Sequence, residues 1–136
     1  MSARDQIAFP KTENLRIPKL LALARGTTCM LTTRVKHQHQ HDHETVVAAH
    51  SDQGKHEKGL GIKAHDCFVA FICHNCHAML PAMKRDDREE LFGHAMLSTR
   101  NYLAAMSLIM GFTLSDMTND AGWLDGWRSG RIQVRK

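Results

Sequence analysis

The segment Cys73-His74-Asn75-Cys76-His77 contains two cysteines that are separated by two residues and followed at once by a histidine. This spacing is compatible with four kinds of chemistry: attachment of a c-type haem, half of a zinc site, a redox dithiol, or the junction of a metal-dependent nuclease finger. The choice among them depends on the compartment of the protein and on the other ligands that the chain supplies.

The N-terminal segment 1–26 has no uninterrupted apolar h-region and no small-residue cleavage site, so it does not resemble a secretory signal. The longest apolar runs, at 68–72 and around 103–112, are far shorter than the roughly 20 residues that a membrane span needs. We therefore expect a cytoplasmic protein without a membrane partner. A reducing compartment disfavours c-type haem and disulfides, so the cysteines are interpreted as metal ligands.

A closed structural zinc site is tetrahedral, so Cys73 and Cys76 need two further ligands. Cys29 is followed by His37, which opens the histidine-rich stretch HQHQHDH at 37–43. On its own this stretch is typical of a solvated loop. Together with the cysteines it predicts a structural Zn²⁺ site made of Cys29, Cys73, Cys76 and one histidine. We take His37 as that histidine, but spacing leaves the choice open among His37, His39, His41 and His43.

The elements that must position these ligands belong to one domain with a small core, because the chain has 136 residues. We expect a flexible arm at 1–14, a domain at 15–114 and a loop-like tail at 115–136. Within the domain the pattern predicts a short helix at 15–24 after Pro18, ended by Gly26, and an amphipathic helix from Asp86 to Gly111. Between them it predicts three strands, CMLTTRV (29–35), TVVAAH (45–50) and CFVAFI (67–72), with Cys67 as an ordinary buried thiol.

Four stretches between about residues 22 and 78 follow one another in a recognisable order: ALARGTTC, ETVVAAH, GLGIKAHD and AFICHNCH. In this order the chain resembles the ββα-metal finger of the HNH endonuclease superfamily. The resemblance is closest to the small prophage-encoded nuclease family typified by YbcO, and more distant to the RecA-dependent Ref nuclease. Two departures stand out. Family members usually have a second cysteine in place of His37, and an acidic residue shortly after the Cys-His pair, where this chain has Ala78 to Pro81.

The resemblance implies an α+β fold, with a zinc-stabilised ββα-metal finger flanked by an N-terminal short helix and a C-terminal amphipathic helix. It also implies a metal-dependent DNA endonuclease of a phage or prophage, acting in the cytoplasm of a bacterial host and serving recombination. A host recombination protein is then a further partner. The net charge of +4 favours a polyanionic partner such as DNA without requiring one.

The same resemblance implies roles for individual residues. His50 would be the general base that activates water, and His77 would hold a catalytic Mg²⁺ or Mn²⁺. Asp66 would either bind that cation or orient His50. Lys63 and Gly61 lie in a glycine-containing loop that could approach a DNA phosphate closely, so they are candidate substrate contacts.

Several alternatives stay open at this point. His65 and His74 are second-ranked ligands, and His56 and His94 are expected at the surface. A non-catalytic zinc-ribbon module that binds nucleic acid or protein would need the cysteines but not His50 or His77. Two copies could associate through the segment 92–110, which would let a single-strand nickase cut both strands. The sequence indicates no preference for a DNA structure or DNA sequence.

Overall fold

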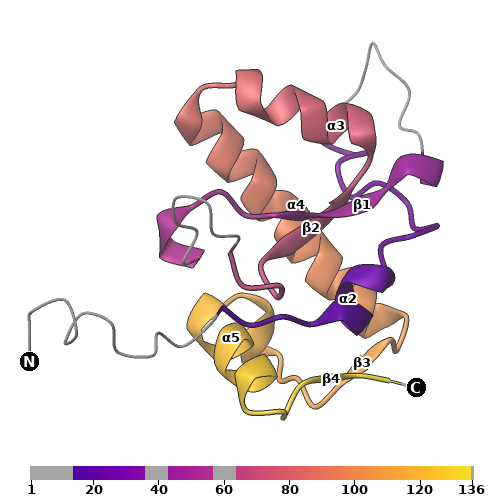
Figure 1. The fold of residues 1–136 in the computed structure, drawn as a ribbon, viewed down its shortest axis with the longest axis vertical. Helices are drawn as coiled ribbons and strands as arrows, with labels where there is room; N and C mark the ends of the chain where they lie inside the picture. The colour runs from indigo at the N-terminus through magenta and orange to yellow at the C-terminus, as the bar shows by residue number, and fades with distance from the viewer. Residues whose placement is uncertain (1–13, 36–42, 57–63, 136) are drawn as a thin grey trace, which may run out of the picture.

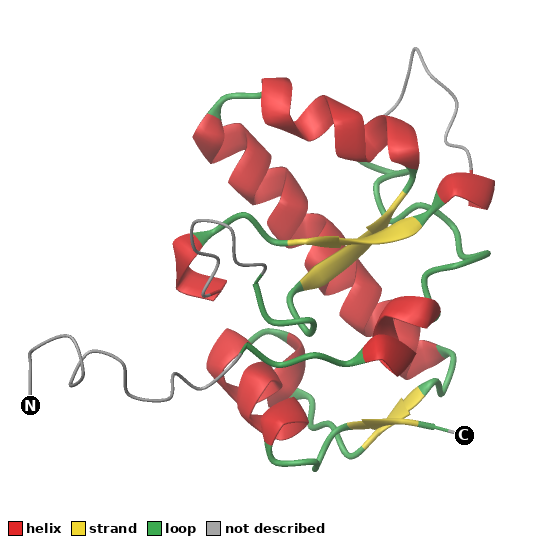
Figure 2. Cartoon of the chain, in the orientation of Figure 1, coloured by secondary structure: helices red, strands yellow, loops and turns green. Residues whose placement is uncertain are grey.

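A computed structural model of the chain describes residues 14–35, 43–56 and 64–135, and Figures 1 and 2 show the arrangement of its elements. Helices and two small sheets pack together, which confirms the expected α+β class. The helices and strands are α2 (Pro18–Ala22), β1 (Val47–His50), β2 (Val69–Ile72), α3 (His74–Met79), α4 (Arg85–Ala105), β3 (Ile109–Met110), α5 (Asp120–Arg128) and β4 (Gln133–Val134). None of the described helices is both long and apolar enough to cross a membrane.

The centre of the fold is the antiparallel pair β1 and β2, in which His50 lies opposite Val69. All four residues of β2 are buried, as expected for a short apolar strand that is covered on both faces. The long helix α4 packs against β2 and crosses behind the strands in Figure 1. The two elements are also joined by a hydrogen bond of 3.0 Å, which the Phe71 N–H donates to Thr99 Oγ1. This packing fixes the sheet on which His50 stands.

The segment 29–35 was expected to be a strand, but it forms turns. Its Met30 N–H donates to Phe71 O at 2.9 Å, and the chain then bends, with Val35 N donating back to Leu31 O at 2.8 Å. Cys29 and Leu31 are fully buried at this bend. The β-branched residues of this segment favour a strand. Burial of Cys29 and Leu31 outweighs that preference, because a bend can direct both side chains into the core.

The amphipathic helix begins at Arg85, as expected within one residue, but it ends at Ala105 and not near Gly111. Ser107 adopts a left-handed conformation with φ of 56°, and Leu108 N donates to Leu103 O at 2.9 Å. Together with the bond from Ser107 N to Ala104 O, this is a Schellman motif, which terminates a helix by satisfying its last carbonyl groups. The chain therefore leaves the helix in time to form β3.

The segment after Ser115 is not loop-like, because it contains helix α5 and strand β4. Asn119 caps α5 through its side-chain oxygen, which accepts a hydrogen bond from Gly122 N at 3.0 Å. Trp123 is 1% exposed and donates from Nε1 to Cys67 O at 2.8 Å. The capping residue Asn119 and the tryptophan are visible in the sequence. Their contribution to the core depends on the contact of Trp123 with the chain around Cys67, which the sequence does not show.

Candidate metal centre and histidine pocket

Three cysteine thiols converge at the junction between β2 and α3. The Sγ atoms of Cys29, Cys73 and Cys76 all lie within 4.8 Å of one another, and those of Cys29 and Cys76 are 3.8 Å apart. All three residues are fully buried. Cys67, in contrast, lies outside this group, and burial raises its pKa to about 12. The cluster can hold a metal ion such as zinc, as its residue types and spacing predicted.

Local geometry explains why the two cysteines of the CxxC motif face the same way. Cys73 is extended and forms the N-cap of α3, so Cys76 follows in the first turn of the helix. The Cys73 N–H donates to Cys29 Sγ at 3.3 Å, which joins the bend at 29–35 to this turn. Backbone N–H donors near thiolates are typical of such sites, because they stabilise negative charge on sulfur.

The thiols of the cluster are difficult to ionise without a nearby cation. Burial is the largest cause that raises the pKa of Cys29 and of Cys76, because a thiolate is poorly solvated there. A divalent cation supplies the positive charge that would let several thiolates share this buried space, and metal binding then stabilises the fold directly.

The expected fourth ligand is not defined. His37, His39 and His41 lie outside the described residues. His43 is described, and its Nδ1 accepts a hydrogen bond from Cys29 N at 3.2 Å. Its ring is not among the donor atoms that converge within 4.8 Å, so the described part of the chain supplies three donors to this centre.

His50 is held by a buried carboxylate. Its Nε2 lies 2.8 Å from Asp66 Oδ1, and its side chain is 18% exposed whereas that of Asp66 is 3% exposed. Since an ionised carboxylate only accepts hydrogen bonds, Nε2 carries the proton in this pair. In the neutral ring Nδ1 then has a free lone pair. The arrangement can therefore present an oriented imidazole base to solvent.

Asp66 is itself held by the N-terminal segment. The Ile17 N–H donates to Asp66 Oδ2 at 2.5 Å, and Arg16 Nη1 donates to Oδ1 at 3.1 Å. The Asp66 N–H in turn donates to Leu15 O at 2.9 Å. Both carboxylate oxygens therefore already accept hydrogen bonds, which is the environment of a side chain that positions another residue.

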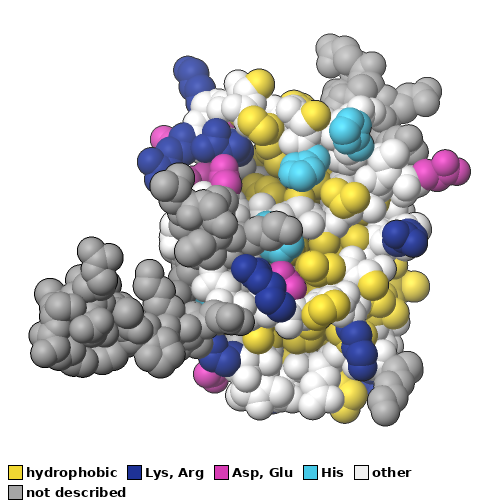
Figure 3. Space-filling view, viewed as in Figure 1, with side chains coloured by type: hydrophobic (Ala, Val, Ile, Leu, Met, Phe, Trp, Pro, Cys, Tyr) yellow, Lys and Arg dark blue, Asp and Glu magenta, His cyan; other side chains and the backbone are white. Residues whose placement is uncertain are grey.

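His50 and His77 line one pocket of about 270 Å³, although they come from β1 and α3. Its other lining residues are Asp52, Leu80, Pro81, Arg88 and Phe92. Figure 3 shows histidine side chains on the face viewed there, among hydrophobic ones and beside a mixed group of basic and acidic side chains. The structure thus brings together the two histidines that were singled out from the sequence.

Asp52 and Arg88 were not predicted from the sequence. Arg88 Nε lies 3.0 Å from Asp52 Oδ2 in this pocket. Asp52 comes two residues after His50, which ends β1, so its position in the sequence could have marked it as a neighbour of that histidine. Arg88 could not have been found in this way, because it sits in the charged run DDREE, which is typical of a solvated helix surface.

The remaining histidines have other surroundings. His65 is buried, and its Nδ1 accepts from Leu15 N at 2.8 Å. His74 is exposed at the start of α3. His56 was expected at the surface, and that prediction is wrong: it is 1% exposed and stacks on Phe68 with a centroid distance of 4.2 Å.

His94 was also expected at the surface, but in the structure its side chain is half-buried. The candidate substrate contacts Lys63 and Gly61 lie outside the described residues.

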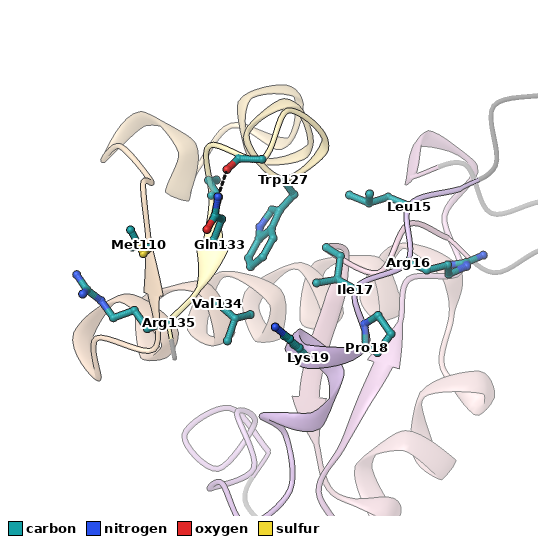
Figure 4. A pocket seen from close by; sticks show the side chains of 12 residues that line it. Leu15, Arg16, Ile17, Pro18, Lys19, Met110, Trp127, Gln133, Val134 and Arg135 are labelled. Atoms are coloured by element: carbon teal, nitrogen blue, oxygen red, sulfur yellow. Dashed lines mark hydrogen bonds between the residues drawn. The ribbon is translucent and has the colours of Figure 1, made fainter.

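A larger cavity of about 830 Å³ lies between the segment 15–19 and the C-terminal part of the chain, where Met110 of β3, Trp127 of α5 and the residues of β4 line it. In Figure 4 the Trp127 ring and the Lys19 side chain extend into the space between these two parts of the chain. Neither a carboxylate nor a histidine is among the residues that line this cavity, so it lacks the acid–base groups that the smaller pocket has.

The smaller pocket, and not the larger one, therefore combines groups that could take part in acid–base chemistry: a histidine held by a carboxylate, a second histidine, a carboxylate and a guanidinium. Comparison of the chain with protein-family models, with curated proteins and with solved structures finds no match in any of the three.

Proposed function

We propose that the protein is a metal-dependent DNA endonuclease of the HNH type, in which β1, β2 and α3 form a ββα-metal finger and the cysteine cluster holds a structural Zn²⁺. One observation carries this proposal. His50, whose Nε2 is held by Asp66, opens into the same pocket as His77. Base and candidate metal ligand thus face one small space, as phosphodiester hydrolysis requires.

In this mechanism a water molecule attacks the scissile phosphorus while the bond to the 3′ oxygen breaks. His50 Nδ1 takes the proton of the attacking water, and Asp66 keeps the ring in the required tautomer and stabilises the imidazolium that forms. The 3′ oxygen leaves as an alkoxide and is protonated from solvent, so the products are a 5′-phosphate and a 3′-hydroxyl. A Mg²⁺ or Mn²⁺ bound near His77 would supply positive charge for the phosphate and for the leaving oxygen.

The proposal extends to the setting of the reaction: a phage or prophage protein in a bacterial cytoplasm, with DNA as substrate and a host recombination protein as partner. It also includes association of two copies through the segment 92–110. Of that segment Met106 and Met110 are exposed, 59% and 43%, whereas Phe92 is buried. An interface would therefore be built from the two methionines.

Nicking of supercoiled plasmid tests the proposal. Zinc-loaded protein freed of other metals is assayed with no addition, with Mg²⁺ and with Mn²⁺, beside His50→Ala, His77→Ala and the matched control His74→Ala on the exposed start of α3. We expect cleavage that depends on the added cation, with a rate at least about 100-fold lower in His50→Ala and unchanged in His74→Ala. Zinc content should be the same in all four proteins.

Absence of cleavage by the unmodified protein with both cations would overturn the proposal, as would equal cleavage by His50→Ala. Either result would favour the non-catalytic zinc-ribbon module that binds nucleic acid or protein. Such a module would also keep its binding in His50→Ala and His77→Ala, and would lose it when a cysteine of the cluster is replaced.

A further inference from the structure

The pocket contains two charged residues, Asp52 and Arg88, to which the mechanism above gives no role. Their side chains are 50% and 23% exposed, and Arg88 Nε approaches Asp52 Oδ2 to 3.0 Å. This Nε is buried and makes no well-aligned hydrogen bond within the part of the chain that is described. The contact is therefore an ion pair without the two-pronged geometry that would lock an arginine to a carboxylate.

The two aspartates near His50 differ in how easily they could bind a cation. Asp66 is buried, and its oxygens accept hydrogen bonds from His50, Arg16 and Ile17. It could bind a metal only by giving up the bonds that hold His50. Asp52 is half-exposed and lines the pocket directly. Since Mg²⁺ and Mn²⁺ prefer oxygen ligands, Asp52 is the better donor.

We propose that Asp52, together with His77, binds the divalent cation of this pocket, and that Arg88 binds the non-bridging oxygens of the substrate phosphate. This inference rests on the proposed endonuclease function and deepens it. The two side chains neutralise each other in the structure. Cation binding at Asp52 releases Arg88, whose planar guanidinium matches two phosphate oxygens. Metal and DNA therefore strengthen each other's binding.

Among the described residues, the pocket presents no preformed set of three cation ligands. Apart from the cysteine cluster, no three donors from His, Cys, Asp or Glu converge within 4.8 Å among the residues that could be described. A Mg²⁺ ion usually retains several waters and takes only one or two protein ligands, completing its shell with substrate oxygens. Asp52 and His77 suffice for such a site, and until the metal arrives Asp52 is held by its ion pair with Arg88.

Mn²⁺ binding tests the first half of the inference without any catalysis. Zinc-loaded protein is titrated with Mn²⁺, and free Mn²⁺ is followed by electron paramagnetic resonance. Asp52→Asn should weaken the affinity at least about 10-fold, the loss expected when a charged oxygen ligand is neutralised. Asp125→Asn, which changes an exposed carboxylate on α5 that lines neither the pocket nor the larger cavity, should bind as the unmodified protein does.

DNA binding tests the second half. The affinity for a short DNA duplex is measured with and without Ca²⁺, which replaces Mg²⁺ without supporting rapid cleavage. Ca²⁺ should tighten binding of the unmodified protein and should do so much less in Arg88→Gln, with partial recovery in Arg88→Lys. An equal gain from Ca²⁺ in Arg88→Gln would overturn the role of Arg88.

Failure of this inference can be told apart from failure of the proposed function. If the unmodified protein cleaves DNA and Asp52→Asn binds Mn²⁺ and cleaves equally well, the assignment of Asp52 is wrong and the endonuclease stands. If no protein cleaves but Asp52→Asn still loses Mn²⁺ affinity, the cation site stands and the endonuclease does not. Circular dichroism should show that Asp52→Asn keeps its fold, as expected for a half-exposed side chain.

Discussion

A single oxygen, Asp66 Oδ1, is contacted by both His50 Nε2, at 2.8 Å, and Arg16 Nη1, at 3.1 Å. The N-terminal segment thereby reaches the histidine of the pocket through one buried carboxylate. Arg16 also donates to Ala64 O at 2.7 Å, which anchors its side chain beside Asp66. The position of His50 thus depends on a segment that is remote from it in the sequence.

Replacing Asp66 by asparagine should lower the turnover of the proposed endonuclease roughly 10- to 100-fold, because the amide no longer fixes the tautomer of His50. It should also cost about 1–3 kcal/mol of stability, since the charge that Arg16 and Ile17 face is removed. Turnover and Michaelis constant are measured on plasmid, and stability by urea unfolding. Asp87→Asn, at an exposed position of α4, is the control. An unchanged turnover in folded Asp66→Asn would contradict this role.

Removing one cysteine of the cluster should abolish the metal centre. Cys29→Ser, Cys73→Ser or Cys76→Ser leaves too few thiolates for tight binding, so the bound zinc measured by mass spectrometry should fall well below one equivalent. Cys67→Ala, at a buried thiol outside the group, should retain its zinc. A strong chelator should lower the thermal midpoint of the unmodified protein. Equal zinc content in all four variants would show that the thiols are merely buried.

Asp120 should make the stability of the fold depend on acid pH. The hydrogen bond from His56 and then that from Arg100 lower the pKa of this carboxyl from its ordinary value of 3.8. A depressed pKa in the folded state contributes stability above the unfolded value of 3.8, and this stability is lost as pH falls below it. Urea unfolding from pH 6 down to pH 2.5 should therefore show a declining advantage of the unmodified protein over Asp120→Asn.

The advantage should be greatest at pH 5 to 6, of the order of 1–3 kcal/mol, and toward the lower end of that range because the Asp120 side chain is 41% exposed. It arises from two contacts: His56 Nε2 lies 2.9 Å from Asp120 Oδ2, and the buried Arg100 donates to Asp120 Oδ1 at 2.8 Å. A difference that stays constant over the whole pH range would contradict the assignment.

The C-terminal part should be essential for stability. Trp123→Ala empties a position that is 1% exposed and removes the hydrogen bond to Cys67 O, so it should destabilise the fold by about 3–5 kcal/mol. Leu114→Ala, at a side chain that is 86% exposed, should change the free energy of unfolding by less than about 0.5 kcal/mol. Both are measured by urea unfolding. Similar stabilities of the two variants would show that the segment after Ser115 is dispensable.

Much of the local organisation was predictable because its signals act over a few residues. Pro18 begins α2, the buried run around Phe71 forms β2, and the helix from Arg85 starts where its acidic first turn indicates. The convergence of three cysteines was predictable for a different reason. The spacing of Cys73 and Cys76 is typical of a metal site, whereas Cys67 sits inside the apolar run CFVAFI and was interpreted as an ordinary buried thiol.

By itself the sequence determined the residue types and part of the local structure: the cysteines, His50 at the end of β1, the buried run of β2 and the start of α4. Tertiary structure alone decided which side chains meet. It placed Arg88 beside Asp52, brought Arg16 to Asp66, and turned α5 into part of the core. The physical reason is that these contacts join distant segments through packing and shared hydrogen bonds, whereas caps and periodicity report only on neighbours along the chain.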